Sequence, residues 1–490
     1  MTEDLSPTAV DSPRPPDPTP SSSEPTPGGF RELIALSLPF ILSASFWTIQ
    51  IFVDRVFLSW VGKNAVAASM PAVGYFWTPM ALANFTVLYV TVFVAQYLGA
   101  KRLNRIGPVV WQAIYFSIVA GALFPLLGPI VDAMIQYSDH DPAVKVLESA
   151  YFSALTFAAL PMLLVGAVNG FFAGRGESWT VLLINAFGTA VNAALAYPLI
   201  VLQKDDPVAA MTGAGYAAAL GSCASAALGL LLYFRPKFRV EYATLSGWRF
   251  DRALFKRLMK FGLPNGMQFC IEGMAFTAFI LLVGNIGNTE LAATNLTFSI
   301  NMLTFLPIMG LGQGVEVLVG KRQGESRPDL SAKTTRTGVT LAMGYMVIVA
   351  ILYCTIPGIL TIPFANGMEP EDWAAIAPLI PVLLRFVALF SLADGFNIIL
   401  SYALRGAGDT RFVTLVAIVL SWPLMVAPTW LACRSGWGVE AAWGFATLYI
   451  SVTAVVYYVR FRGGKWRTMK VIETTVTDAT EPTVAEPKGQ

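Results

Sequence analysis

Long apolar segments recur about twelve times along this 490-residue chain, and they restrict its fold more than any other feature of the sequence. A helix needs roughly 20 mostly apolar residues to cross a lipid bilayer. Lipid offers no partner to backbone N–H and C=O groups, so a crossing segment must satisfy them within its own helix. The sequence therefore predicts an all-α integral membrane protein with about twelve transmembrane helices.

The positions of the spans follow from the apolar segments and their polar flanks. In the first half of the chain we expect spans at about 33–60, 65–98, 107–134, 146–173, 179–202 and 212–234. In the second half we expect them at about 261–283, 291–320, 338–362, 374–403, 412–433 and 439–458. Several exceed the minimum length, so tilted or kinked helices are expected.

The composition leaves little material for enzyme chemistry. Hydrophobic residues make up 55% of the chain and charged residues 13%. The single histidine, His140, lies in a polar segment, so a His-based metal site or a Ser-His-Asp triad lacks its parts. The four cysteines are far apart and show neither CxxC spacing nor a disulfide framework. We expect no catalytic activity, no cofactor and no nucleic-acid partner.

Basic residues in the connections between spans gather on one side of the membrane. One set of connections holds Lys101, Arg102, Arg105, Arg175, Arg235, Lys237, Arg239, Arg249, Arg252, Lys256, Arg257, Lys260, Lys321, Arg322, Arg327, Lys333, Arg336, Arg405 and Arg411. The opposite set holds little beyond Lys63, Lys145, Lys204 and Arg434. Because basic loops remain in the cytoplasm, both termini are expected there, in a multi-pass protein of the plasma membrane.

The two halves of the chain resemble each other when the second is shifted back by 225 residues. Pro264 then falls on Pro39, and Gly324 falls on Gly99. Internal repeats of this size are typical of transporters. The period contains six spans, an even number, so the halves have the same orientation and form parallel repeats.

These features predict a chain of two lobes with polar ends. The expected parts are a disordered cytoplasmic tail at 1–29, an N-lobe of six spans at 30–234, a basic cytoplasmic linker at 235–260, a C-lobe of six spans at 261–462 and a polar cytoplasmic tail at 463–490. The first tail is rich in Pro, Ser, Thr and acidic residues, a composition typical of disorder.

Three carboxylates lie inside expected spans: Asp54 in the first, Glu272 in the seventh and Asp394 in the tenth. A charge deep in lipid costs on the order of 3 kcal/mol by insertion scales, so such residues are functional candidates. Glu272 and Asp394 belong to the same half, where two carboxylates facing one cavity favour uptake of a proton or jointly hold a cation. Both outcomes suit coupling to H⁺ or Na⁺, and Na⁺ at these two acids is the one metal site indicated.

Structural roles are the alternative for these acids. Asp54 could pair with the adjacent Arg55 or reach toward Lys63 near the end of the first span. The two acids of the second half could form a structural pair with Arg385 or a hydrogen-bonded network. Removal of the carboxylates from a functional transporter distinguishes these possibilities.

Several short motifs occur in order along the chain. They are Phe52-Val53-Asp54, Ala95-Gln96-Tyr97-Leu98-Gly99-Ala100, Phe172-Ala173-Gly174-Arg175-Gly176, Gly262-Leu263-Pro264 and Leu404-Arg405-Gly406-Ala407-Gly408-Asp409-Thr410. In this order the chain resembles the multidrug and toxic compound extrusion (MATE) family, over about residues 30–462. The resemblance implies two six-helix lobes arranged in a V around a central cleft, and monomeric transporters that export organic, often cationic, compounds in exchange for cations.

The resemblance also implies roles for the intramembrane acids. Glu272 and Asp394 look like the C-lobe cation-site acids of the bacterial NorM-like branch, and Asp54 looks like the first-span acid implicated in proton coupling. Asn192 resembles a polar N-lobe position of the family, but one turn later this chain has Ala196. This departure weakens an N-lobe ion site and favours one in the C-lobe.

A cleft that binds flat organic cations is expected to combine aromatic rings, methionines and amides with one or two carboxylates. By their depth in the spans, the candidate cleft residues are Tyr75, Trp77, Asn84, Asn185, Asn192, Gln268, Asn301 and Met302.

Two other functions remain open. A lipid-linked oligosaccharide flippase of the same superfamily should carry basic residues in its cavity to meet pyrophosphate, whereas only Arg55 and Arg385 fall within the expected spans. A nontransporting membrane scaffold leaves the intramembrane acids unexplained. A multidrug transporter accounts best for acids at these depths.

Overall fold

A computed structural model describes residues 26–365 and 370–473 of the chain. Most of the predicted tails at 1–29 and 463–490 therefore lies outside the described residues. The part that is described contains helices and no strand, which confirms the all-α prediction. Within residues 26–365 and 370–473, twelve helical segments are long and apolar enough to cross a membrane, as expected from the sequence.

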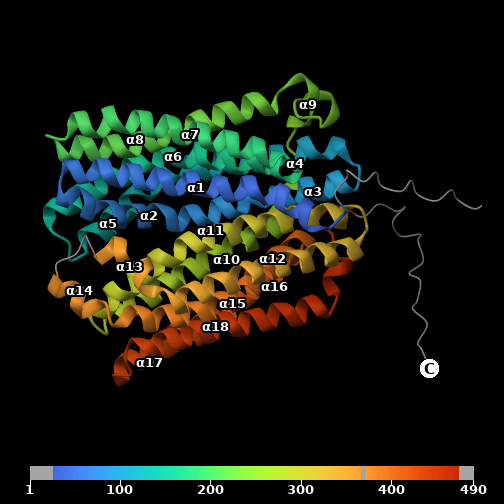
Figure 1. The fold of residues 1–490 in the computed structure, drawn as a ribbon. Coiled ribbons are helices and arrows are strands. Elements are labelled where there is room, and N and C mark those ends of the chain that lie inside the picture. Colours follow the sequence, from blue (N-terminus) through green and yellow to red (C-terminus); the bar gives the residue numbers. More distant parts are fainter. Residues whose placement is uncertain (1–25, 366–369, 474–490) are drawn as a thin grey trace, which may run out of the picture.

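The first six spans form the N-lobe, drawn blue to green in Figure 1. Its helices are α1 (Phe30–Val61), α2 (Lys63–Leu88), α3 (Val90–Gly99), α4 (Ile106–Leu123), α5 (Gly128–Gln136), α6 (Pro142–Gly174), α7 (Ser178–Ile200) and α8 (Pro207–Tyr233). Short 3₁₀ turns η1 (Leu103–Arg105), η2 (Phe124–Leu127) and η3 (Val201–Gln203) join or extend them. α2 with α3, and α4 with α5, each make one span.

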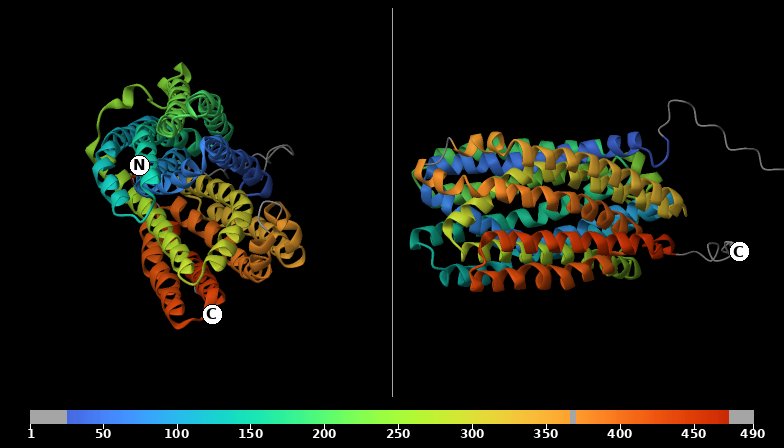
Figure 2. Two further views of the ribbon diagram at one scale, coloured as in Figure 1. Left: turned by 90° about the vertical axis from the view of Figure 1, so that its left-hand side faces the viewer. Right: turned by 60° about the horizontal axis from the view of Figure 1, so that its bottom comes forward.

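The other six spans form the C-lobe, drawn yellow to red beside the N-lobe (Figures 1 and 2). Its helices are α10 (Arg252–Gly284), α11 (Asn288–Gly324), α12 (Pro328–Thr355), α13 (Pro357–Ala365), α14 (Pro370–Ile376), α15 (Leu379–Ala407), α16 (Thr410–Ser421), α17 (Ala427–Ser435) and α18 (Gly438–Arg462). A π-helical turn, η5 (Trp422–Val426), joins α16 to α17. Along the chain, α9 (Pro236–Glu241) and η4 (Ser246–Trp248) follow the N-lobe and precede the C-lobe, and η6 (Lys465–Thr468) follows α18.

Aspartates determine where several spans begin. Asp141, Asp206 and Asp251 precede α6, α8 and α10, and each side chain accepts a hydrogen bond from one or two backbone N–H groups of the first turn. These groups have no partner within the helix, so the acids satisfy donors that would otherwise be orphaned. Pro142 and Pro207 then occupy the first helical position, where a missing N–H costs nothing.

The ninth span differs from the expectation of 338–362. The helix begins at Pro328, about ten residues earlier, and ends at Thr355. Ile356 leaves the helical conformation, with φ −129° and ψ 41°, directly before Pro357. A residue before proline is pushed out of the α region by the proline ring, so the apolar sequence continues but the helix does not.

Small residues bring the two lobes into contact. A Cβ on Gly266 of α10 would lie 2.2 Å from the carbonyl oxygen of Leu82 in α2. A Cβ on Gly310 of α11 would lie 2.5 Å from the side chain of Ile41 in α1. Glycine therefore permits a backbone approach that any side chain would block.

These contacts lie in the half of the bundle at which α1 begins and α18 ends (Figure 1). We call it the basic end, because basic residues such as Arg102, Lys321 and Arg411 lie in or next to its connections. There, α1 contacts α11, α2 contacts α10, and α3 contacts α11. The lobes are joined at this end and form the V-shaped pair that the family resemblance implies.

Candidate functional site

Two acids, one in each of two helices, lie within the C-lobe. Glu272 lies in α10 and Asp394, which is 6% exposed, lies in α15. The Gln268 amide donates a hydrogen bond of 3.3 Å to Glu272, and the Asn397 amide donates one of 3.3 Å to Asp394. The charges of Arg405 and Asp394 both act electrostatically on the Glu272 carboxyl.

This pair of acids is not neutralised by Arg385. The Arg385 side chain is exposed, and no ion pair joins it to either acid within the described residues. Tyr449 of α18 instead interacts electrostatically with both Glu272 and Asp394. The two predicted C-lobe acids thus lie within electrostatic range of each other, and each accepts a hydrogen bond from a neighbouring amide.

Asp54 occupies a separate place in the N-lobe. It is 8% exposed, and its Oδ1 atom has no hydrogen-bond partner among the described residues. Arg55 points away and contacts the sulfur of Met70, so the adjacent arginine does not pair with this acid. Tyr151 of α6 is in electrostatic contact with it. Asp54 is therefore not part of the C-lobe cluster.

A cavity of about 450 Å³ lies between the lobes and is lined by both. Of the candidate cleft residues, Trp77, Asn84, Asn185 and Met302 line it. Tyr75, Asn192, Gln268 and Asn301 do not, and neither do Asp54, Glu272 or Asp394. The Asn185 side chain donates a hydrogen bond of 2.6 Å to Ser43 and accepts one of 3.0 Å from Asn169. Ser43 and Asn169 also line the cavity.

The charges that line this cavity are Glu316 of α11 and Arg405 of α15. Their nearest charged atoms, Oε1 and Nε, are 3.6 Å apart. The Arg405 guanidinium lies over the Tyr402 ring at 3.9 Å and over the Phe269 ring at 4.8 Å. The Tyr89 hydroxyl of the N-lobe donates a hydrogen bond of 2.8 Å to the Arg405 carbonyl oxygen. This bond links the two lobes at the end of α15.

The predicted place of Arg405 in a basic connection is wrong. It lies in the last turn of α15 and is 1% exposed, because α15 continues to Ala407 before Gly408 adopts a left-handed conformation. Glu316 did not emerge as a candidate from the sequence, although it is an acid inside an expected span. The sequence indicates Glu316 and Arg405 only in that each is a charged residue in an otherwise apolar segment near the end of a span.

The MatE family model matches residues 39–198 and 264–431, one segment in each lobe. The chain belongs to the MatE family. This confirms the family that the motifs indicate. Two curated relatives bear the name probable multidrug resistance protein NorM, which agrees with the predicted NorM-like branch.

The first of these NorM relatives, from Xanthomonas axonopodis pv. citri, is 28% identical over 452 residues, covering 90% of this chain and 95% of the relative. The second, from Bradyrhizobium diazoefficiens, is 29% identical over 447 residues, covering 88% and 93%. Two solved structures share the fold, each with a TM-score of 0.80. The first is an outward-facing multidrug resistance MATE family transporter, which is 18% identical over 89% of this chain and 96% of its own. The second is a MOP superfamily transporter from Pyrococcus furiosus, which is 19% identical over 89% of this chain and 96% of its own.

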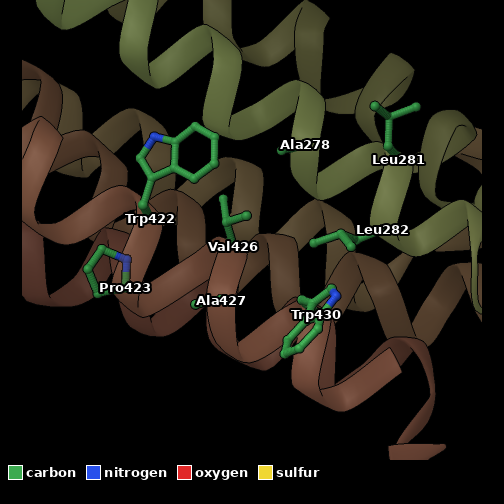
Figure 3. Close-up of a pocket in the computed structure, with 8 residues that line it drawn as sticks. All are labelled: Ala278, Leu281, Leu282, Trp422, Pro423, Val426, Ala427 and Trp430. Carbon is green, nitrogen blue, oxygen red and sulfur yellow. The ribbon is translucent and has the colours of Figure 1, made fainter. Parts of the chain in front are cut away.

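A second hollow of this MatE protein lies between α10 and the segment formed by η5 and α17 (Figure 3). It has a volume of about 660 Å³ and is lined by Ala278, Leu281, Leu282, Trp422, Pro423, Val426, Ala427 and Trp430. These side chains are apolar except for the indole N–H groups, and none of the eight lining residues is charged. This hollow offers nothing to bind an ion, whereas charged side chains line the central cavity, so the central cavity is the candidate substrate site.

Proposed function

We propose that this MatE protein is a secondary active transporter that exports organic, often cationic, compounds by antiport with H⁺ or Na⁺. The observation that carries the proposal is the cavity between the two lobes, with the acids Glu272 and Asp394 close by in the C-lobe interior. The NorM names of its relatives support multidrug export. Substrate occupies the cavity, and the coupling ion occupies the acid pair.

The acid pair suits ion coupling because a carboxylate held among apolar helices gains much from a proton or a cation. Substrate and ion need not touch each other. They need only favour different conformations, since coupling is a difference in binding free energy between states. An ion that enters down its gradient thus drives the lobes toward the state that releases substrate.

The charge of the connections supports an orientation. We infer that the basic end faces the cytoplasm of the bacterial inner membrane, because basic connections remain on that side. The lobes are joined there, so the V opens to the outside. A monomer suffices for this cycle, because both lobes and the cavity belong to one chain.

Arg405 bears on the rival function of a lipid-linked oligosaccharide flippase, because a cation in the cavity is what a pyrophosphate requires. Glu316 lies 3.6 Å from its guanidinium and offsets its charge. A pyrophosphate would meet this carboxylate at close range, which is unfavourable. The cavity therefore favours organic export.

The test is efflux of a fluorescent organic cation from proteoliposomes under an imposed H⁺ or Na⁺ gradient. Glu272→Gln and Asp394→Asn are expected to abolish gradient-driven efflux, while Asp139→Asn, which changes an exposed acid outside the spans, retains it. Loss of coupling in Asp54→Asn alone would move the ion site to the N-lobe. Absence of organic efflux from well-folded protein would contradict the proposed function.

A further inference from the structure

We propose that residues 463–473 form a latch that holds the two lobes together at the basic end and releases the N-lobe when that end opens. This segment, the C-terminal strap, follows α18, contains η6 and reaches Glu473. It lies at the same end of the bundle as α3 (Figure 1). Such a role goes beyond the proposed transport function, because it concerns what keeps one end of the cavity closed.

The first half of the strap is fixed to the C-lobe by Trp466. Its side chain is buried, and its ring stacks on that of Phe461 in α18 at a centroid distance of 4.7 Å. The Trp466 indole N–H donates a hydrogen bond of 2.7 Å to the Phe461 carbonyl oxygen. Gln323 of α11 donates one of 3.2 Å to the Trp466 carbonyl oxygen. These contacts tie the strap to two helices of the C-lobe.

The last residue of the strap, Glu473, is held by the N-lobe instead. Its carboxyl accepts a hydrogen bond of 2.8 Å from the Tyr97 hydroxyl and forms an ion pair of 3.2 Å with Arg105. Arg102 donates a hydrogen bond of 2.7 Å to the Glu473 backbone carbonyl oxygen. These three partners lie in α3 or in the connection directly after it. The strap therefore spans the boundary between the lobes.

Val471 lies at this boundary and contacts both lobes. Its side chain is fully buried, and a Cβ on Gly408, at the end of α15, would lie 2.9 Å from it. Arg257 of α10 donates a hydrogen bond of 3.1 Å to the Val471 carbonyl oxygen. The Val471 backbone N–H donates one of 2.8 Å to Oε1 of Gln96 in α3. The lobes cannot separate without breaking the bonds on one side of this residue.

Gln96 couples release of the strap to separation of the lobes. Its buried amide donates a hydrogen bond of 3.0 Å to the Gly406 carbonyl oxygen of α15, while its Oε1 atom accepts the bond from Val471. When α3 moves away from α15, both bonds break together. Detachment of the strap and opening of the basic end therefore favour each other, which is the condition for coupling.

The strap is expected to leave the N-lobe and to remain on the C-lobe. The side chains of Arg105 and Glu473 are each 38% exposed, so water replaces these partners at little net cost. The C-lobe contact buries the indole of Trp466 against Phe461, and its loss would expose a large apolar surface. The weaker contacts thus lie on the side that moves, as a reversible latch requires.

Pulsed EPR between two spin labels tests the latch in the full chain, in lipid nanodiscs. The four native cysteines are changed to serine, and the labels are attached through Lys237→Cys and Arg336→Cys. Both positions are exposed. Lys237 lies in α9, which packs on the N-lobe through the rings of Phe238 and Phe171, and Arg336 lies in α12 of the C-lobe. The distance between the labels reports separation of the lobes.

Two variants weaken the hold of the N-lobe on the strap. Glu473→Ala removes the contacts with Tyr97 and Arg105, and we expect it to raise the population with the longer distance about tenfold. Tyr97→Phe removes only the hydroxyl, so an increase of about threefold is expected. The measurement uses neither substrate nor an ion gradient, so its outcome does not depend on transport.

Two controls separate the latch from a general loosening of the protein. Asp329→Asn changes an exposed acid at the same end, which pairs with Arg327. Arg175→Lys weakens packing on the aromatic rings beside α6 and leaves the strap intact. Both controls should keep the wild-type distances. If Glu473→Ala and Tyr97→Phe also keep them, or if Arg175→Lys raises the longer-distance population as much, the latch is wrong.

A cross-link tests whether the strap has to detach during transport. In the cysteine-free chain, Arg105→Cys and Glu473→Cys are joined by a bismaleimide with a reducible disulfide in its linker. We expect the cross-linked protein to lose efflux of the fluorescent organic cation from proteoliposomes and to regain it on reduction. Full efflux from cross-linked protein would overturn the latch. If no sample transports the cation, the transport proposal fails, and the distances alone decide the latch.

Discussion

Gly99 and Gly324 lie on opposite sides of the crossing between α3 and α11, each pressed against the backbone of the other helix. A Cβ on Gly99 would lie 2.0 Å from the Lys321 carbonyl oxygen, and a Cβ on Gly324 would lie 2.0 Å from the Gln96 carbonyl oxygen. The two glycines are 225 residues apart, as are Gln96 and Lys321. The sequence repeat therefore becomes a reciprocal contact that joins the lobes at the basic end.

Gly324→Ala is expected to force α3 and α11 apart and to destabilise the protein by roughly 1–3 kcal/mol, because the contact is with backbone that cannot rotate away. Thermal unfolding in detergent measures this change. Gly344→Ala in α12 is the matched control, since nothing lies within 4 Å of its Cβ position. A Gly324 variant as stable as this control would show that the crossing is not tight.

Gln96 links three parts of the chain at the same end. Its amide donates a hydrogen bond of 3.0 Å to the Gly406 carbonyl oxygen, and its Oε1 atom accepts one of 2.8 Å from the Val471 backbone N–H. In Gln96→Ala both backbone groups lose their partner at buried positions, at a cost of roughly 1–3 kcal/mol for each group left unsatisfied. We expect a lower unfolding temperature and faster proteolysis after residue 462. An unchanged cleavage rate would mean that this link does not hold the C-terminal segment.

Glu473 makes stability depend on pH. Burial alone would raise the pKa of its carboxyl, but the Tyr97 hydroxyl at 2.8 Å, a backbone hydrogen bond and Arg105 outweigh burial and lower the pKa below its usual value near 4.5. The folded pKa is thus below the unfolded one. Its stabilising effect is complete above pH 4.5 and is lost as the pH falls through the folded pKa.

Glu473→Gln is therefore expected to unfold at a lower temperature than the wild type at pH 7, with a difference that shrinks on acidification. Unfolding scans between about pH 7 and pH 3 measure the effect. Asp139→Asn, which changes an exposed acid, should follow the wild type. A constant difference across this range would exclude the ionised carboxyl as the source of the stabilisation.

Arg175 is held by three aromatic rings after the end of α6. Its guanidinium lies 4.7 Å from the Phe171 ring, 4.3 Å from the Phe238 ring and 4.3 Å from the Tyr242 ring. Arg175→Lys keeps the charge but loses the planar stacking surface, so we expect a loss of about 1 kcal/mol. The measurement is the unfolding temperature, with Arg327→Lys at an exposed position as the control. Equal stability in both variants would mean that charge alone suffices here.

Much of the fold was predictable because the bilayer imposes simple physical rules. Each span has to be long, apolar and helical, so the twelve segments and their pairing into two parallel halves are visible in the sequence. The cost of a charge in lipid likewise identifies Asp54, Glu272 and Asp394 as unusual. What such rules cannot specify is which side chains face the same space.

The sequence by itself therefore determined the helices, their number and the presence of intramembrane acids. Only the tertiary structure decided that Arg405 lies inside the protein rather than in a connection, since burial there depends on Tyr402, Phe269 and the N-lobe residue Tyr89. It also decided that Glu316 faces the cavity and Glu272 does not. The physical reason is that the rotation and crossing of packed helices are set by contacts between residues far apart in the chain, which no local pattern encodes.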